Sequence, residues 1–372
     1  HIDADNKRFQ DFIEETEKKL DMEITVEKCP SNADNRQAKI STILASGDKN
    51  IDLISVNDEM ISEFKHKGYL EPLEKNVMTE EVRDSFPQKY LESICEENGH
   101  IYSVPFQMDI MMFWVNQELL KQAGLDEIKN TGDFDILQKS LKNPDQYAYG
   151  DAWENTHVYN SLSQFVNFWG GDYFDWTDPK TKDAARYMKS MLDEKNTSPA
   201  QFVDQYEQME EKFIRGKYGC VFMYTSALGT FLDADVYGKN KIHMAPLPVL
   251  HKKKATNIAT WQYVLNNASE NKDAAVRFLQ YAAGYEGSTE YAKIMKSYPA
   301  RVDVIENEDI DLEGIDMIRK YLREYTLNAR PLCENSMGAV SDMGKLFQGY
   351  VLGQCEEDSF FEQAQNCINT YY

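Results

Sequence analysis

One short unit constrains the fold more than any other part of the sequence. Residues 24–27 (ITVE) alternate apolar and polar side chains as a strand does, and residues 50–56 (NIDLISV) are apolar enough for a buried strand. A helical pattern that ends at Gly47 lies between them. A right-handed crossover through that helix would make the two strands parallel. The unit therefore predicts an α/β fold.

Two polar residues follow the second predicted strand. Asn57 and Asp58 stand where the strand ends, and ligands of open parallel sheets bind beyond the carboxyl ends of strands. Asn and Asp also cap helices, and a helix is predicted from about Glu59 to Lys67. Ligand binding and helix capping are equally good interpretations of this pair.

A second apolar region contains a polar pair. We predict one strand before Pro105 and another over residues 110–115, with Gln107 and Asp109 interrupting them. Burying such groups without partners costs a few kcal/mol, on the order of 1–3 each. Gln107 and Asp109 must therefore find hydrogen bonds inside the protein or from a ligand.

Length and charge limit the function classes. With 372 residues, the chain exceeds the usual size of one hydrophobic core, so two lobes are expected. A formal net charge of -22 repels phosphate backbones and anionic lipids, which argues against nucleic acid as a partner. The six cysteines lie far apart without zinc-site spacing, and we expect mostly free, buried thiols.

Motifs for catalysis are missing from the sequence. It contains no GxGxxG, P-loop, HExxH or GxSxG pattern. A partial calcium-loop pattern starts at Asp309 but has Lys320 where the closing glutamate belongs, so we predict a solvated acidic turn. We expect no metal, no cofactor and no catalytic residues, although a glycosidase needs only two carboxylates brought together in space.

The positive signal is a mixture of aromatic and polar residues in predicted loops and at strand ends. A sugar pocket needs flat rings to stack on and carboxylates or amides that form hydrogen bonds. Core packing is favoured over ligand stacking for each single ring, and most strongly for Trp169 and Trp176. The residues that offer the mixture are Trp153, Glu154 and His157, then Tyr224 and Thr225, and finally Trp261.

The ordered set of segments resembles the family 1 extracellular solute-binding proteins of ABC importers, which include maltose-binding protein. Each matching segment is weak alone, but their order over nearly the whole chain is specific. The segments are ISTILASGDKNIDLISVNDE, KGYLEPLE, GHIYSVPFQMDIMMFWVNQELLKQAGL, FWGGDYFD, FIRGKYGCVFMY, MAPLPV, NKDAAVRFLQY and EGSTEYAKIMKSYPAR.

The resemblance implies a two-lobed periplasmic-binding-protein-like fold of type II, in which a mixed sheet flanked by helices forms each lobe. The chain would cross a hinge near residues 105–111, 254–260 and 304–312, with the sugar between the lobes. The N-terminal lobe would comprise residues 1–108 and 257–308, and the C-terminal lobe residues 109–256 and 309–372.

The resemblance also implies a set of ligand-binding positions. Asn57 and Asp58 match the first polar ligand loop, and Gln107 and Asp109 lie at the first crossing. The remaining matches are Trp153, Glu154 and His157 in a loop of the second lobe, Tyr224 and Thr225 at a strand end, Trp261 after the second crossing, and Asn335 in CENSMGAV. That last segment lacks a ring that α-glucan receptors often have, which argues against maltose-like specificity.

The resemblance implies an extracytoplasmic receptor that delivers an oligosaccharide or sugar to the membrane permease subunits of an ABC importer. We expect a monomer, either periplasmic or lipid-anchored at a Gram-positive cell surface. Family members have a strand and a ligand-facing loop before the first helix, so one strand of the N-terminal lobe is expected to be missing here. The alternatives are a glycoside-active enzyme and a receptor for a peptide or cationic solute.

Overall fold

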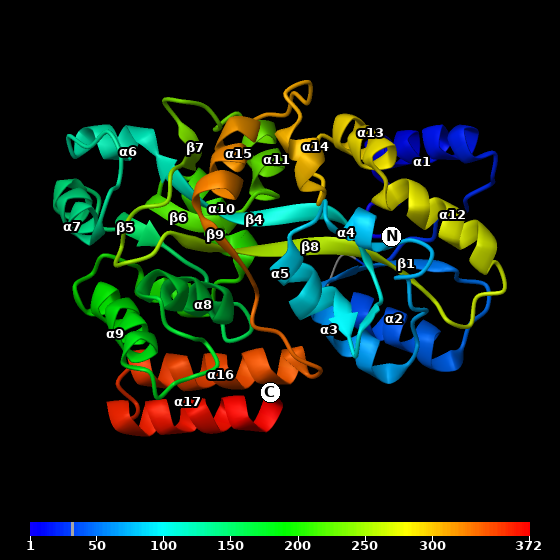
Figure 1. The fold of residues 1–372 in the computed structure, drawn as a ribbon. Coiled ribbons are helices and arrows are strands. Elements are labelled where there is room, and N and C mark those ends of the chain that lie inside the picture. Colours follow the sequence, from blue (N-terminus) through cyan, green and yellow to red (C-terminus); the bar gives the residue numbers. More distant parts are fainter. Residues whose placement is uncertain (31–32) are drawn as a thin grey trace. The chain divides into compact units, whose positions relative to one another are not determined.

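The computed structural model describes residues 1–30 and 33–372 and has a mixed α/β architecture (Figure 1). The chain divides into two compact units. Unit 1 consists of His1–Asp109 and Ala259–Ile315, and unit 2 of Ile110–Ile258 and Asp316–Tyr372. None of the helices formed by the described residues combines the length and the apolar character that a membrane span requires.

Unit 1 contains short strands and helices from both of its chain segments. Its elements are α1 (Lys7–Leu20), α2 (Ala33–Ser46), β1 (Leu53–Asn57), α3 (Asp58–Phe64), η1 (Lys65–Lys67), α4 (Glu80–Arg83), α5 (Gln88–Tyr90), η2 (Leu91–Cys95), β2 (Glu96–Glu97), β3 (His100–Ile101), α12 (Lys272–Ala283), α13 (Tyr285–Met295) and α14 (Val302–Glu306). The strands β4 (Val104–Asn116) and β8 (Ala255–Leu265) contribute residues to both units.

Unit 2 is richer in long helices. Its elements are α6 (Gln117–Gln122), α7 (Thr131–Ser140), β5 (Tyr147–Gly150), α8 (Val158–Trp169), α9 (Pro179–Asp193), η3 (Pro199–Val203), α10 (Tyr206–Ile214), β6 (Tyr218–Tyr224), α11 (Ala227–Asp233), β7 (Ile242–Ala245), α15 (Ile315–Glu324), β9 (Thr326–Ala329), α16 (Ser336–Val351) and α17 (Glu357–Tyr371).

The first helix has the N-terminal cap and the apolar face that its sequence predicts. Asn6 precedes α1, and its side chain accepts a hydrogen bond from the Arg8 amide at 2.9 Å. Phe9, Phe12 and Ile13 are buried along one face, three and four residues apart. Burial of this stripe, rather than helix propensity, fixes α1 on unit 1.

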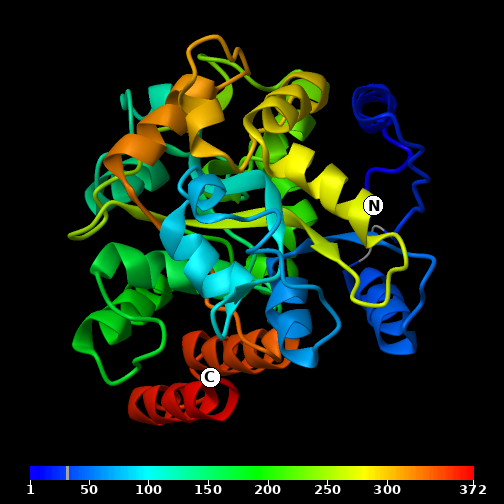
Figure 2. The same cartoon turned by 45° about the vertical axis from the view of Figure 1, so that its right-hand side comes forward.

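The prediction of a strand over residues 24–27 is wrong. Within the described residues it joins no sheet, although Figure 2 shows the stretch leaving α1 as an extended coil. The predicted strand at residues 50–56 does form, as β1, and pairs antiparallel with β8. An isolated segment needs a neighbour to satisfy its backbone groups, so strand-like sequence alone does not make a strand.

The predicted break near Pro105 is also wrong. β4 runs without interruption from Val104 to Asn116, with Pro105 at its second position, where a missing amide is tolerated. Gln107 and Asp109 therefore lie on a continuous strand and do not end one.

The sheet of unit 2 is mixed. Phe113 of β4 pairs antiparallel with Phe222 of β6 and with Ala245 of β7, and β5 pairs parallel with β6. All residues of β6 are buried, so helices cover both faces of this strand. Trp176 and Trp169 are core side chains, as their sequence context favours.

The C-terminal helices α16 and α17 run antiparallel, side by side (Figure 1). Helix α16 also lies against the loop that precedes α8, where the chain of Asn155 passes close to Gly344. A Cβ atom added to Gly344 would stand 1.9 Å from the Asn155 carbonyl oxygen. Only glycine allows this approach, so Gly344 fixes where the loop lies.

Replacing this glycine tests the packing. We expect Gly344→Ala to lower the free energy of unfolding by about 2 kcal/mol, because the loop backbone must shift. Gly349→Ala in the same helix is the control, since its nearest neighbouring atom would be 4.0 Å away. The control should be neutral or more stable by up to ~1 kcal/mol. Equal urea midpoints for the two variants would contradict the close approach of Asn155 to Gly344.

Candidate functional site

In unit 1, the end of β1 brings together two of the predicted site residues. Asn57 is the last residue of β1 and the N-cap of α3, where its side chain accepts a hydrogen bond from the Met60 amide at 3.3 Å. Asn57 pairs with Trp261 of β8 in the antiparallel register. Residues far apart in sequence therefore lie side by side.

Asp58 is fully buried at the start of α3. Its carboxylate accepts a hydrogen bond from the Thr260 amide at 2.8 Å, and it stands in the first turn of a helix, where negative charge is favoured. Asp58 thus ties the start of α3 to β8. This contact holds Asn57 beside Trp261.

The Trp261 ring is half-buried and supported by a cation. The Arg36 guanidinium carbon lies 5.3 Å from the ring centroid, a cation–π distance. Arg36 is buried, and its Nη1 donates to the Pro30 carbonyl at 3.2 Å. Burial lowers the pKa of Arg36, against the opposing charges of Glu59 and Cys29. The arrangement gives a fixed ring that keeps part of its surface in solvent.

The polar pair on β4 is accommodated within unit 1. The Tyr291 hydroxyl donates to Gln107 Oε1 at 2.8 Å, and the backbone of Gln107 forms a bridge with Pro299. Asp109 is also buried. Gln107 therefore has the internal hydrogen bond that a polar side chain on an otherwise apolar strand needs.

In unit 2, a buried carboxylate organises the loop before α8. Asp151 accepts hydrogen bonds from Tyr149 OH at 2.7 Å, Trp153 Nε1 at 2.9 Å, Ser161 Oγ at 2.5 Å and the Ala152 amide at 2.8 Å. Burial raises the pKa of Asp151, although these donors oppose the shift. The four donors hold the backbone from residue 149 to residue 153 in place.

Trp153 is a core residue, the alternative that its sequence context also allowed. The side chain is fully buried, and its ring packs edge-on against Phe202 and Phe347, with centroid distances of 5.6 and 5.5 Å. Its ring is thus engaged with other rings of unit 2.

Glu154 and His157 form a local polar cluster at the same loop. Glu154 Oε2 accepts from the Thr156 amide at 2.8 Å and Thr156 Oγ1 at 2.6 Å, and it lies 3.2 Å from His157 Nδ1. Burial alone would raise the pKa of Glu154, but the hydrogen bonds from Thr156 and His157 outweigh it and lower the pKa. Glu154 is therefore ionised at neutral pH.

Tyr224 lies in a second cluster of unit 2, among residues that sequence analysis did not single out. Its hydroxyl donates to Asn160 Oδ1 at 3.0 Å, and its ring stacks with Tyr206 at 6.3 Å between centroids. Arg330 lies 5.9 Å from the Tyr224 ring, and its Nη1 donates to Tyr159 OH at 2.7 Å. The cluster combines rings, an amide and a cation.

Thr225 and Asn335 have structural partners. Thr225 Oγ1 accepts from the Ile110 amide at 3.2 Å, which joins the end of β6 to β4. Asn335 is the exposed N-cap of α16 and accepts from the Gly338 amide at 3.1 Å.

The residues that sequence reasoning missed carried only weak local signals. Tyr159 and Asn160 directly follow the aromatic and polar loop at Trp153, and a longer window would have included them. Arg330 precedes a proline, and Arg36 lies inside a helix. Neither arginine is marked by spacing, because only tertiary packing places it over a ring.

The described part of the chain offers no metal-binding constellation. It contains no group of three or more His, Cys, Asp or Glu side chains placed to hold an ion. The six cysteines are separate thiols, of which Cys333 and Cys355 are half-buried and the other four buried.

Comparison with known proteins places the chain among binding proteins. Residues 3–289 match the model of a family described as bacterial extracellular solute-binding protein. A probable amino-acid ABC transporter periplasmic-binding protein from Sinorhizobium fredii is 24% identical over 239 residues, which cover 61% of this chain and 54% of that protein. The chain thus spans about half the length of the curated relatives it matches.

Solved structures show the same fold at low sequence identity. An ABC transporter solute-binding protein from Thermotoga lettingae bound with α-D-tagatose superposes with a TM-score of 0.83 at 18% identity, covering 100% of this chain and 97% of that one. Maltose-bound MalE3 from T. maritima gives 0.80 at 17% identity, covering 98% and 96%. The predicted periplasmic-binding-protein-like fold is confirmed.

The Asp58 contact can be tested by removing its acceptor. We expect Asp58→Ala to lower the free energy of unfolding by about 2 kcal/mol, because the Thr260 amide loses a buried partner. Asp58→Asn keeps an acceptor oxygen and should lose less. Denaturant titration followed by circular dichroism measures both, and equal losses would contradict the contact.

The Glu154 cluster predicts a dependence on pH. Because the folded-state pKa lies below the unfolded value of about 4.3, ionised Glu154 stabilises the protein above that pH, and the stabilisation disappears as the pH falls through the folded-state pKa. Glu154→Gln should cost about 1 kcal/mol at pH 7 and progressively less below pH ~4. If the difference in unfolding free energy between Glu154→Gln and the parent chain stays constant over this pH range, Glu154 is not stabilised in its ionised form.

Proposed function

This chain belongs to the bacterial extracellular solute-binding proteins, and we propose that it is an extracytoplasmic carbohydrate receptor of an ABC importer. It binds its ligand without chemical conversion and presents it to membrane permease subunits. We assign the two compact units to the two lobes of the receptor. The protein acts as a monomer, in the periplasm or lipid-anchored at the cell surface.

The observation that carries the carbohydrate proposal is the position of Trp261. Trp261 is half-buried, its ring is supported by Arg36, and its backbone pairs with that of Asn57. A sugar presents apolar C–H faces to a ring and hydroxyl groups to neighbouring polar atoms. A rigid ring beside an amide suits both demands, and its fixed position limits the conformational entropy lost on binding.

Unit 2 supports the proposal with a different set of groups. Tyr224 and Tyr206 supply stacked rings, while Asn160 and Arg330 supply an amide and a cation close to them. The ligand contacts in unit 2 are assigned to this cluster together with Glu154 and His157. Trp153 supports them from the core through its bond to Asp151.

A second cargo class is favoured by one relative and one pair of charges. The Sinorhizobium fredii protein is described as a probable amino-acid ABC transporter periplasmic-binding protein. In unit 2, ionised Glu154 and the Arg330 guanidinium offer opposite charges of the kind that an amino acid or peptide pairs with. Titration with amino acids and short peptides, alone and in competition with sugars, separates the two classes.

Binding calorimetry tests the role of Trp261. A panel of neutral mono- and oligosaccharides should contain a ligand that Trp261→Ala binds at least about tenfold more weakly and Trp261→Phe binds nearly as well as the parent chain. Phe174→Ala removes an exposed ring elsewhere in the chain as the control and should leave affinity unchanged. No heat with any sugar, or equal loss in the control, counts against the proposal.

The chemical fate of the ligand separates a receptor from an enzyme. An oligosaccharide incubated with the protein should be recovered intact at stoichiometric occupancy, as judged by mass spectrometry. A glycoside hydrolase would release shorter products. Cleaved glycan that accumulates with time would overturn the receptor function.

A further inference from the structure

A buried hydrogen-bond network holds the two residues that flank Trp261 in unit 1. Trp261 stands between Thr260 and Gln262 on β8. Successive side chains of a strand point to opposite faces, so Thr260 and Gln262 share the face that Trp261 does not occupy. They are 2% and 0% exposed, whereas Trp261 is half-buried. The contacts of Thr260 and Gln262 therefore also hold the backbone that carries the Trp261 ring.

The hydroxyl of Tyr90 joins both flanking residues. Tyr90 OH lies 2.6 Å from Thr260 Oγ1 and accepts a hydrogen bond from Gln262 Nε2 at 3.0 Å. Tyr90 is itself buried, so these bonds form away from solvent, where they are electrostatically stronger than in water. One oxygen atom thus links the residues on either side of Trp261.

The side-chain oxygen of Gln262 is held by two further donors. Cys95 Sγ donates to Gln262 Oε1 at 3.2 Å, and Ser103 Oγ donates to the same oxygen. Burial raises the pKa of Cys95 to about 12, so the thiol keeps its proton at neutral pH and remains a donor. The two donors fix the orientation of the Gln262 amide, which directs Nε2 to Tyr90.

A π-helix brings Tyr90 and Cys95 to the same side chain. In an α-helix, residues five apart lie about 140° apart around the axis. The segment η2 is a π-helix, in which the Glu96 amide donates to the Leu91 carbonyl five residues earlier. Such a turn brings residues five apart much closer to one face of the helix. Tyr90 and Cys95 can therefore both reach Gln262.

Buried Lys65 closes the end of this π-helix. Its ammonium group donates to the carbonyl oxygens of Ser93, Ile94 and Glu96 at 3.3, 3.0 and 2.9 Å. The last carbonyls of a helix have no partner within the helix, and a cation is favoured beside them. Lys65 thereby holds η2 in the position from which Tyr90 and Cys95 contact Gln262.

The network acts where the ladder between β1 and β8 ends. The last pair of that ladder is Asn57 with Trp261. Thr260 lies one residue beyond it, and its amide donates to the Asp58 carboxylate at 2.8 Å. With Tyr90 at its hydroxyl, Thr260 is held through both its backbone and its side chain. These contacts fix the end of the ladder at the residue that carries the ring.

We propose that Tyr90 is a positioning residue for ligand binding, which acts through Thr260 and Gln262 to hold the Trp261 ring in the orientation in which a sugar stacks on it. This inference rests on the proposed function of Trp261 as a ligand-stacking ring. Tyr90 is buried and contacts the face of β8 opposite to Trp261, so it does not touch the ligand. A ring that is already fixed loses little conformational entropy on binding.

Removal of the Tyr90 hydroxyl tests this role. At room temperature, with the protein folded, Tyr90→Phe should bind a neutral sugar about fivefold more weakly than the parent chain, the effect of one buried hydrogen bond. In the ligand-free protein, ¹⁵N relaxation of the Trp261 indole should show a more mobile ring. A residue that only stabilised the fold would change neither readout in the folded protein.

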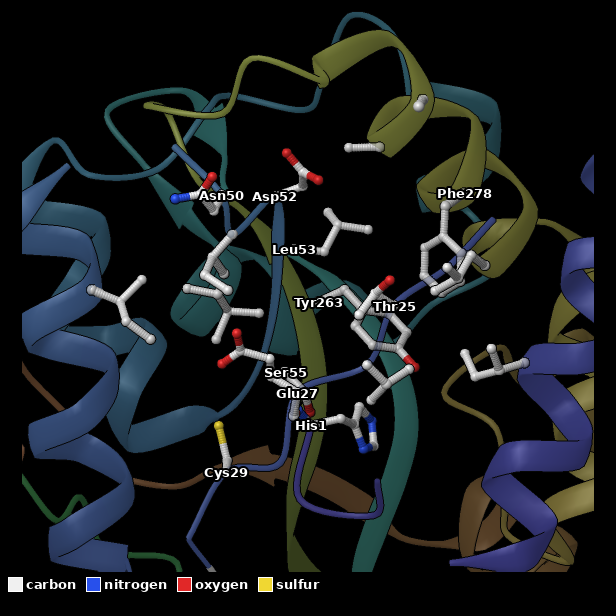
Figure 3. Close-up of a pocket in the computed structure, with 18 of the residues that line it drawn as sticks. His1, Thr25, Glu27, Cys29, Asn50, Asp52, Leu53, Ser55, Tyr263 and Phe278 are labelled. Carbon is white, nitrogen blue, oxygen red and sulfur yellow. The ribbon is translucent and has the colours of Figure 1, made fainter. Parts of the chain in front are cut away.

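Tyr263→Phe is the matched control, because it removes the hydroxyl of another buried tyrosine on the same strand. Within the described residues, the Tyr263 hydroxyl has no hydrogen-bond partner. Its ring packs against Phe106 and Phe278, with centroid distances of 4.1 and 5.3 Å. Figure 3 shows Tyr263 and Phe278 at the pocket that they help to line. The control should leave the affinity and the mobility of the Trp261 ring unchanged.

A second variant tests the connection through Thr260. Thr260→Val removes the hydroxyl that faces Tyr90 and keeps the amide that donates to Asp58. Because both substitutions break the same bond, the double variant should lose about as much affinity as Tyr90→Phe alone. Losses that multiply to about 25-fold would mean that the two hydroxyls act independently, which overturns the proposal.

The mobility of the ring separates this proposal from the receptor function. If no sugar binds to the parent chain, the receptor function fails, and the relaxation of the Trp261 indole alone decides on the role of Tyr90. An indole that is as rigid in Tyr90→Phe as in the parent chain overturns the positioning role, whatever the affinity. Equal effects of Tyr90→Phe and Tyr263→Phe overturn it as well.

Discussion

The free energy cost of burying a carboxylate governs how both candidate regions are built. A buried charge needs strong donors, and it fixes the position of whatever supplies them. Asp58 in unit 1 is satisfied by the Thr260 amide, which holds the start of α3 against β8. Asp151 in unit 2 is satisfied by four donors from neighbouring residues. Each carboxylate thereby positions the groups that we assign to ligand contact.

The two units supply complementary chemistry. Unit 1 offers a half-buried indole ring with a cation against it, and unit 2 offers stacked tyrosines with an amide and a guanidinium. A net charge of -22 gives the whole protein a field that favours neutral or cationic ligands over anionic ones. A neutral polyhydroxylated ligand fits the rings and the amides without opposing that field.

Local sequence rules predicted the regular elements well. The capping residue Asn6 and the spacing of Phe9, Phe12 and Ile13 predict α1, and the polar residues after β1 predict the start of α3. Such features depend on contacts within a few turns of chain, which a single sequence records. The α/β fold was predicted from the family resemblance and from the unit of residues 24–56, although residues 24–27 form no strand and β1 pairs antiparallel with β8.

The remaining features depend on tertiary contacts. Residues 24–27 have the pattern of a strand, yet no neighbour pairs with them among the described residues. Trp153 has the context of a ligand-stacking ring, yet Phe202 and Phe347 enclose it. Arg36 and Arg330 have no local signature, because long-range packing brings each of them to an aromatic ring. Pattern and spacing therefore could not predict the roles of these residues.

The most direct test of ligand contact at Trp261 is an NMR titration of the tryptophan indole N–H signals with a neutral oligosaccharide that binds. The chain has five tryptophans, of which Trp114, Trp153 and Trp176 are fully buried. The account predicts that the Trp261 indole signal shifts in a saturable manner while the signals of those three stay in place. Saturable binding that leaves the Trp261 signal unmoved would contradict the account.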